Sequence, residues 1–107
     1  MMEDISLRDA QSRVDVWVRN TRSGYFNELT NLGILMEEVG ELSRIFVRTY
    51  GAQKGKQEDK SLMNLPDEMA DILWVLLCLA NQTGVDLTDA LIKNFEKKNA
   101  RDAGRHG

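Results

Sequence analysis

The fold of this chain is decided by two acidic stretches, EEVGEL at positions 37–42 and DEMADIL at positions 67–73. Each stretch holds a pair of carboxylates three residues apart, Glu38 with Glu41 and Glu68 with Asp71. A three-residue step on an α-helix brings both side chains to one face, with their Cβ atoms about 5–6 Å apart. Apolar residues surround both pairs at helical spacing. We therefore expect two helices whose paired carboxylates form a cage where the helices face each other.

Both pairs occupy positions at which helices pack against each other. The residues of the two seams, with steps of three and four, are Ile34, Glu38, Glu41 and Ile45 in the first helix and Glu68, Asp71, Val75 and Cys78 in the second. Anions enclosed in such a seam without a partner are too costly to persist, so the cage calls for a cation. Carboxylate oxygens suit hard divalent ions, which predicts a Mg²⁺ site with Mn²⁺ or Ca²⁺ as alternatives.

The remaining sequence also predicts helices, because it has one Pro and no alternating β-branched stretch. We expect a first helix from Ser6 that fades over residues 20–24 and a second over about 27–50 that stops at Gly51. A third helix over about 64–82, with Gly84 as its stop, precedes a fourth that begins at Asp86. The pattern predicts an all-α chain, a four-helix bundle-type single domain over residues 1–107, with a mobile polar loop at about 52–62.

Composition narrows the class of protein. The chain has 107 residues, of which 42% are hydrophobic and 29% are charged, and its net charge is −3. No apolar run reaches the length of a membrane span, and the first residues lack the order of a secretory signal. The lone Cys78 lies among leucines and reads as a core residue in a reducing compartment, so we expect a cytoplasmic protein. The third helix is apolar on most sides, which predicts a homodimer or homotetramer.

Charge is unevenly distributed, because the tail over about 93–107 carries +3 and the rest of the chain −6. Lys93, Lys97 and Arg101 follow at steps of four and form one basic stripe, which Asn94 and Lys98 flank. The dipole of a helix favours cations at its C-terminus even without a ligand. An acidic cage beside a basic tail nevertheless indicates an anionic, metal-bound ligand.

The double motif, E-E-x-x-E at 37–41 followed by E-x-x-D at 68–71, resembles the MazG-like nucleotide pyrophosphohydrolases of the all-α nucleoside triphosphate pyrophosphohydrolase superfamily. The resemblance continues through GVDL at 84–87, NFEKK at 94–98 and RD at 101–102. It implies Mg²⁺-dependent hydrolysis of (deoxy)nucleoside triphosphates to monophosphate and pyrophosphate, as house-cleaning of the nucleotide pool. The sequence departs from the family's pattern in the length and composition of the segment 52–60.

The resemblance also implies roles for individual residues. Four carboxylates are implied as metal ligands: Glu38, Glu41, Glu68 and Asp71. Glu37 lies about 100° around the helix from Glu38 and is implied to bind a second metal or to orient the attacking water, so Glu37 and Glu38 are the candidate catalytic residues. The residues implied to bind the substrate phosphates are Lys93, Asn94, Lys97, Lys98 and Arg101.

Other functions remain open. The acidic pairs could be ordinary surface charges, but Glu37 and Glu41 repel each other at a step of four, as do Asp67 and Asp71. A di-iron carboxylate bundle would need a Glu-x-x-His motif, which is absent here. A non-catalytic metal- or nucleotide-binding interaction module is the main alternative, and nucleic-acid binding is disfavoured by the acidic charge.

Three remaining side chains are of types that often bind ligands. Trp17 and Trp74 could stack on a base, but their apolar stripes favour core positions. His106 is too isolated in the tail to be assigned a ligand role.

Overall fold

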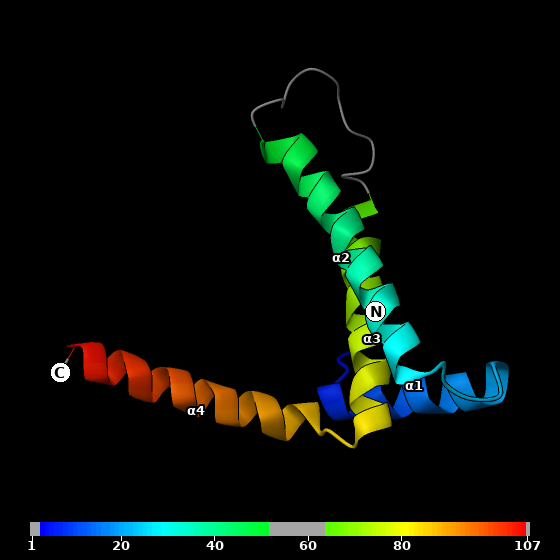
Figure 1. Cartoon of the computed structure of the whole chain (residues 1–107). Helices are drawn as coiled ribbons and strands as arrows, with labels where there is room; N and C mark the ends of the chain where they lie inside the picture. The colour runs from blue at the N-terminus through cyan, green and yellow to red at the C-terminus, as the bar shows by residue number, and fades with distance from the viewer. Residues whose placement is uncertain (1–2, 52–63, 107) are drawn as a thin grey trace.

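The computed structural model describes residues 3–51 and 64–106, and these residues form four α-helices and no strand (Figure 1). The helices are α1 (Leu7–Thr21), α2 (Glu28–Tyr50), α3 (Leu65–Thr83) and α4 (Leu87–His106). The all-α class is therefore confirmed. The loop predicted at about 52–62 lies outside the described residues.

Short polar side chains begin three of the four helices. The Ser6 hydroxyl accepts a hydrogen bond from the Asp9 backbone N–H at 3.0 Å, and the Asn27 side chain accepts one from Leu29 at 2.8 Å. The Asp86 carboxylate accepts from the Thr88 backbone N–H at 2.9 Å. Each cap satisfies an N–H group that the first turn of a helix leaves unpaired, so these starts are set locally by the sequence.

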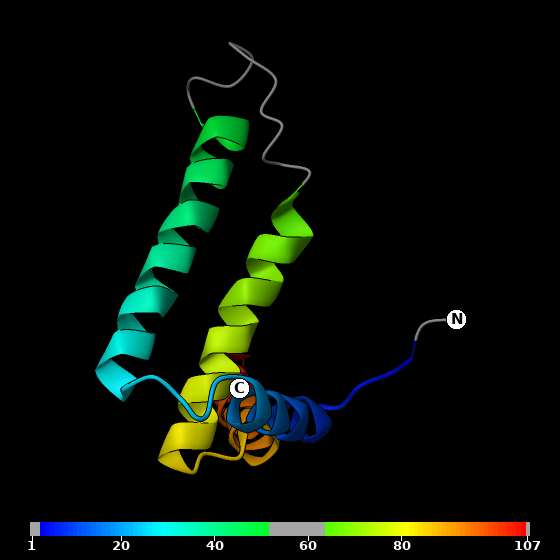
Figure 2. The ribbon, with the colours of Figure 1, turned by 90° about the vertical axis from the view of Figure 1, so that its right-hand side faces the viewer.

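The helices pack as a hairpin with one crossing helix and one projecting helix. Helices α2 and α3 run antiparallel side by side, and α1 packs across the C-terminal half of α3 (Figures 1 and 2). Between α3 and α4 the chain turns by 103°, after Gly84 adopts a left-handed conformation with φ 72°. As a result α4 packs against α1 and points away from the hairpin (Figure 1).

The described core is small and lies where α1 crosses α3. Val14 and Val18 of α1 pack with Leu77 and Cys78 of α3, and each is at most 5% exposed. The burial expected for Cys78 is therefore confirmed. Around this core lie partly buried side chains from the neighbouring segments: Ala10, Tyr25, Trp74 and Leu87.

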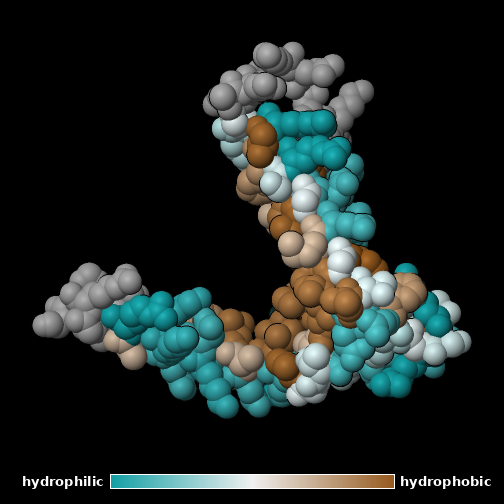
Figure 3. All heavy atoms as spheres, viewed as in Figure 1, coloured by the Kyte–Doolittle hydropathy of each residue, from teal (hydrophilic) through white to brown (hydrophobic). Residues whose placement is uncertain are grey.

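Much of the apolar surface of the hairpin is uncovered in the single chain. The large apolar side chains that stay exposed include Leu32, Met36, Val39 and Phe46 on α2, Met69, Leu73 and Leu76 on α3, and Leu91, Ile92 and Phe95 on α4. Figure 3 shows hydrophobic surface gathered in the angle between the hairpin and α4. Since α4 turns away at Gly84, the described residues of one chain do not form a closed four-helix bundle.

Within the described residues, no single helix has both the length and the hydropathy of a membrane span. Helices α3 and α4 reach that length and hydropathy only when they are taken together across their bend.

Candidate metal centre and adjoining cavity

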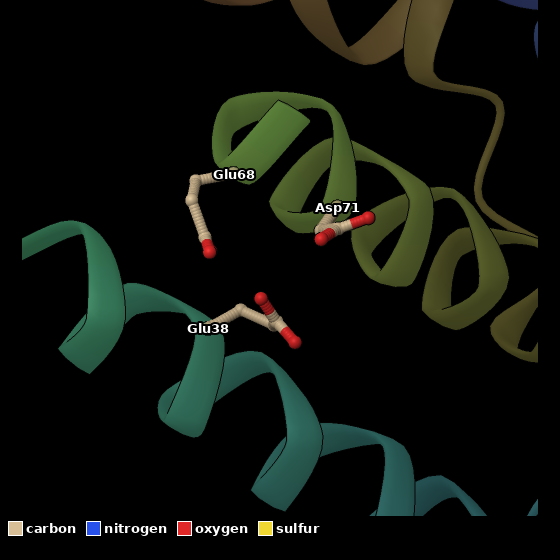
Figure 4. Close-up of side chains that lie close together, drawn as sticks. All are labelled: Glu38, Glu68 and Asp71. Atoms are coloured by element: carbon tan, nitrogen blue, oxygen red, sulfur yellow. The ribbon is translucent and has the colours of Figure 1, made fainter. Parts of the chain in front are cut away.

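Three carboxylates meet between the two helices of the hairpin. Glu38 projects from α2 toward Glu68 and Asp71, which project from α3 (Figure 4). One oxygen from each residue lies within 4.8 Å of the others. Ligands on opposite sides of a bound ion are about 4–5 Å apart for Mg²⁺ or Ca²⁺, so this spacing matches the scale of one coordination sphere.

The electrostatics of this acidic cluster are unfavourable without a cation. The pKa of Glu38 is raised, first by its partial burial and then by the negative charge of Asp71 and the adjacent carboxyls of Glu68 and Glu41. No ion pair among the described residues 3–51 and 64–106 involves Glu38, Glu68 or Asp71. No basic side chain in the described part of the chain therefore forms an ion pair that would balance the charge of the cluster.

An orphaned oxygen indicates that the cluster fits a metal ion. Glu68 Oε2 is buried and accepts no hydrogen bond from the described residues. Leaving a buried acceptor unpaired costs about 1–3 kcal/mol, and more when the group is charged. A hard divalent cation would satisfy this oxygen and screen the three carboxylates together, so the residues present fit the ion that the sequence predicts.

Other predicted site residues lie outside this cluster. Glu41 is one turn beyond Glu38 and is exposed, as is Glu37 on the neighbouring face of α2. The predicted phosphate-binding residues are all exposed on α4: Lys93, Asn94, Lys97, Lys98 and Arg101. Because α4 points away from the hairpin, the single chain does not bring them to the acidic cluster (Figure 1).

A cavity adjoins the acidic cluster. It has a volume of about 440 Å³, and the residues that line it include Glu38, Asp71, Trp17, Phe26 and Trp74. Trp17 lines the cavity and is 41% exposed, so the expectation that it lies in the core is wrong. The two tryptophan rings meet edge to face, with 5.2 Å between their centroids. Two carboxylates of the acidic cluster thus line the same cavity as three aromatic side chains.

Sequence reasoning missed three residues of this cavity, Phe26, Asn31 and Arg22. Asn31 is only 5% exposed, and its Nδ2 donates a hydrogen bond to Gln82 Oε1 at 2.8 Å. Its position extends the seam of α2 by one step, since Asn31, Ile34 and Glu38 are spaced three and four. A polar residue at a seam position could therefore have been found from the sequence. Arg22 lies in the α1–α2 connection, where no periodic pattern marks it.

Comparison with protein families gives a match over most of the chain. Residues 26–106 match the family model described as the MazG nucleotide pyrophosphohydrolase domain. The matched region contains both helices of the hairpin and therefore all three residues of the acidic cluster.

Curated relatives and solved structures agree with this match. Two uncharacterized proteins of Bacillus subtilis strain 168 are similar to this chain. YpjD is 37% identical over 97% of this chain and 93% of its own length. YvdC is 28% identical over 91% of this chain and 96% of its own length. A crystal structure of YpjD from Bacillus subtilis, described as a candidate pyrophosphatase, has a TM-score of 0.74 at 36% identity and covers 90% of this chain and 97% of its own. A Bacillus-conserved MazG protein, described as a nucleotide pyrophosphohydrolase, has a TM-score of 0.74 at 31% identity, with coverage of 90% and 92%.

Proposed function

The chain belongs to the MazG nucleotide pyrophosphohydrolase family, and from this premise we propose that it hydrolyses (deoxy)nucleoside triphosphates to monophosphate and pyrophosphate with Mg²⁺. The observation that carries the proposal is the convergence of Glu38, Glu68 and Asp71 within 4.8 Å from two facing helices. MazG-type pyrophosphohydrolases generally depend on a divalent metal. A triphosphate would be repelled by an acidic cluster unless divalent ions neutralised both.

We assign the metal to Glu38, Glu68 and Asp71, with Glu41 as a fourth ligand from the next turn of α2. When bound, the ion would stabilise charge on the phosphate and lower the pKa of the attacking water. We assign to Glu37 the task of orienting that water. The water oxygen bonds to the α-phosphorus, the bond from the α-phosphorus to its bridging oxygen breaks, and pyrophosphate leaves. The proton of the water passes through a carboxylate to solvent.

The basic stripe of α4 would hold the anionic end of the substrate. Since α4 of one chain points away from its own acidic cluster, we propose that α4 of a second copy supplies these residues in a homodimer or homotetramer. The exposed apolar side chains of α2, α3 and α4 would form the contact between copies. This assembly would bring basic and acidic residues to opposite ends of one triphosphate.

Hydrolysis in ¹⁸O-labelled water tests the proposed reaction. The purified chain is assayed with common triphosphates and Mg²⁺ or Mn²⁺, and pyrophosphate and orthophosphate are measured separately. We expect pyrophosphate, with the label in the nucleoside monophosphate. Orthophosphate with a nucleoside diphosphate would show attack at the γ-phosphorus and contradict the assignment. An absence of turnover with every triphosphate would favour a binding module.

A further inference from the structure

Two cavities of about 440 Å³ lie on the described part of the chain. The cavity between α1 and the α3–α4 corner is polar, but its groups satisfy one another. Gln11 Nε2 donates to Asn81 Oδ1 at 3.1 Å and to the Val85 carbonyl at 2.8 Å, and Arg8 pairs with Asp86 at 2.8 Å. This cavity therefore offers a ligand little that is unpaired. The cavity beside the acidic cluster differs.

Several side chains that line the cavity beside the acidic cluster end in planar groups, namely aromatic rings and a guanidinium. The guanidinium of Arg22 lies 5.2 Å from the centroids of both the Trp17 ring and the Phe26 ring. Aromatic rings and guanidinium planes are surfaces on which nucleic-acid bases stack. The volume also falls within the range of about 300–1,000 Å³ that is typical of small-molecule sites. A planar ring system held here would have its attached phosphates within reach of Glu38 and Asp71, which line the same cavity.

A hydrogen-bonded relay fixes which atom of Asn31 is available to a ligand. A backbone carbonyl can only accept, so the bond of 2.6 Å from Gln82 to the Phe26 carbonyl must be donated by Gln82 Nε2. Gln82 Oε1 is then the atom that accepts from Asn31 Nδ2 at 2.8 Å. Because an amide has one nitrogen and one oxygen, Asn31 keeps its oxygen. Within the described residues, the Asn31 side chain donates through Nδ2 to Gln82, and none of their hydrogen bonds ends on its oxygen.

We propose that this cavity holds the base of the nucleotide substrate and that the Asn31 side-chain oxygen, oriented by Gln82, selects bases with an exocyclic amino group. This inference rests on the proposed function and deepens it, since it names the substrate class. The amino group of cytosine or adenine donates to an acceptor. The corresponding carbonyl of uracil or hypoxanthine would place one acceptor against another in a buried site, which is strongly unfavourable. Gln82 acts as a positioning residue, because it reaches the base only through Asn31.

Matched pairs of substrates test the selection. The ratio of kcat/KM for dCTP over dUTP, and for dATP over dITP, compares an amino group with a carbonyl at the same ring position, together with the change of the neighbouring ring nitrogen from an acceptor to an N–H donor. We expect the unchanged protein to favour the amino base at least about tenfold, equivalent to about 1.4 kcal/mol. Asn31→Ala should bring both ratios close to one. Gln82→Met should also lower them, because the Asn31 amide is then free to turn. Asn20→Ala, at an exposed position of α1, is the control and should leave both ratios unchanged.

Base binding is measured separately from hydrolysis by tryptophan fluorescence. Titration with deoxycytidine and deoxyuridine, which lack the phosphate that the metal-free acidic cluster would repel, should quench Trp17 and Trp74, with deoxycytidine binding more tightly in the unchanged protein and equally with deoxyuridine in Asn31→Ala. Circular dichroism reports whether each variant is folded, and Gln82→Met carries the test if Asn31→Ala is not. Selective binding without hydrolysis of any triphosphate would refute the proposed function and leave the base pocket standing. No quenching by either nucleoside, equal affinity for both in the unchanged protein, or ratios unchanged in a folded variant would overturn the base pocket.

Discussion

At the scale of single residues, Tyr25 joins three parts of the fold through one hydroxyl. It donates a hydrogen bond to Asp15 Oδ1 at 2.7 Å and accepts one from Asn81 Nδ2 at 2.9 Å. Burial, and after it the hydrogen bond to Asp15, raises the pKa of Tyr25 to about 12. The same hydrogen bond is the main cause that lowers the pKa of Asp15. The folded state therefore favours a neutral phenol beside a charged carboxylate.

Tyr25→Phe should destabilise the protein by about 1–3 kcal/mol at pH 8, because two partly buried polar groups lose their partner. The loss should shrink as the pH rises from about 10 toward 12. In the unfolded chain tyrosine ionises near pH 10, whereas the pKa of Tyr25 in the folded protein is higher. The stability that the Tyr25 hydroxyl contributes is therefore complete below pH 10 and is lost as the pH rises above it. Urea unfolding at pH 8 and pH 11 measures both effects. Tyr50→Phe, at an exposed position, is the control. A constant difference between the two pH values would contradict this account.

Glu38 and Asp71 give a second prediction at this scale. Glu38→Gln or Asp71→Asn should raise metal-free stability slightly, by about 0.5 kcal/mol, because each removes a like charge from the cluster. The same change should abolish Mg²⁺-dependent turnover and the rise in Tm that Mg²⁺ gives the unchanged protein. Thermal unfolding with and without Mg²⁺ measures this, and Glu28→Gln at an exposed position of α2 is the control. Full activity in either cluster variant at saturating substrate would refute the ligand assignment.

At the scale of elements, the direction of α4 depends on the end of α3. Gly84 has φ 72°, a conformation that residues with a Cβ rarely adopt, and a Cβ built there meets no atom within 4 Å. The constraint is therefore one of backbone conformation and not of space. Gly33, in the interior of α2, offers a matched contrast, because a Cβ there also meets no atom within 4 Å while its backbone is helical.

Gly84→Ala should cost about 1–2 kcal/mol, since a left-handed conformation disfavours any residue with a Cβ. Gly33→Ala should instead stabilise the protein by about 0.5–1 kcal/mol, because alanine is the better helix former. Denaturant midpoints at constant m-value measure both changes. If the two variants shift stability in the same direction, backbone conformation at residue 84 does not control the α3–α4 junction.

How much the sequence predicted varies with how local each feature is. The starts at Ser6 and Asn27 and the stops at Gly51 and Gly84 follow from nearby side chains and backbone preferences, so they could be read from the chain. The meeting of Glu38 with Glu68 and Asp71 was also predictable, because seam spacing fixes which faces touch. The exposure of Trp17, the role of Arg22 and the direction of α4 depend on packing between distant segments, which periodicity does not describe.

At the scale of the whole molecule, the uncovered apolar surface calls for a partner. Large apolar side chains are exposed along both helices of the hairpin and along α4, including Met36, Leu73 and Phe95. Contiguous apolar surface on this scale marks an interface in most proteins. A second copy of the chain is the occupant we propose, since a symmetric contact would cover the same faces on both copies.

We expect sedimentation at micromolar concentration to give a dimer or tetramer. A double variant, Met36→Glu with Leu73→Glu, should dissociate it, because charges would be buried in an apolar contact. Asn20→Glu, which adds a charge at an exposed position of α1, is the control. Since association also covers hydrophobic surface, the unfolding midpoint should rise with protein concentration in the unchanged protein. A stable monomer of the unchanged protein would contradict the proposed assembly.

Complementation between two inactive variants tests whether α4 of one copy serves the acidic cluster of another. Glu38→Gln damages the cluster, and Lys97→Ala with Lys98→Ala damages the basic stripe. If the two parts of a site come from different copies of a dimer, a mixed dimer has one site with both parts intact and one with neither. An equal mixture that has been dissociated and reassembled should then recover about a quarter of full activity, because about half of the dimers are mixed and one of their two sites works. If each α4 serves its own chain, every site carries a defect, and the mixture should be no more active than the average of its components.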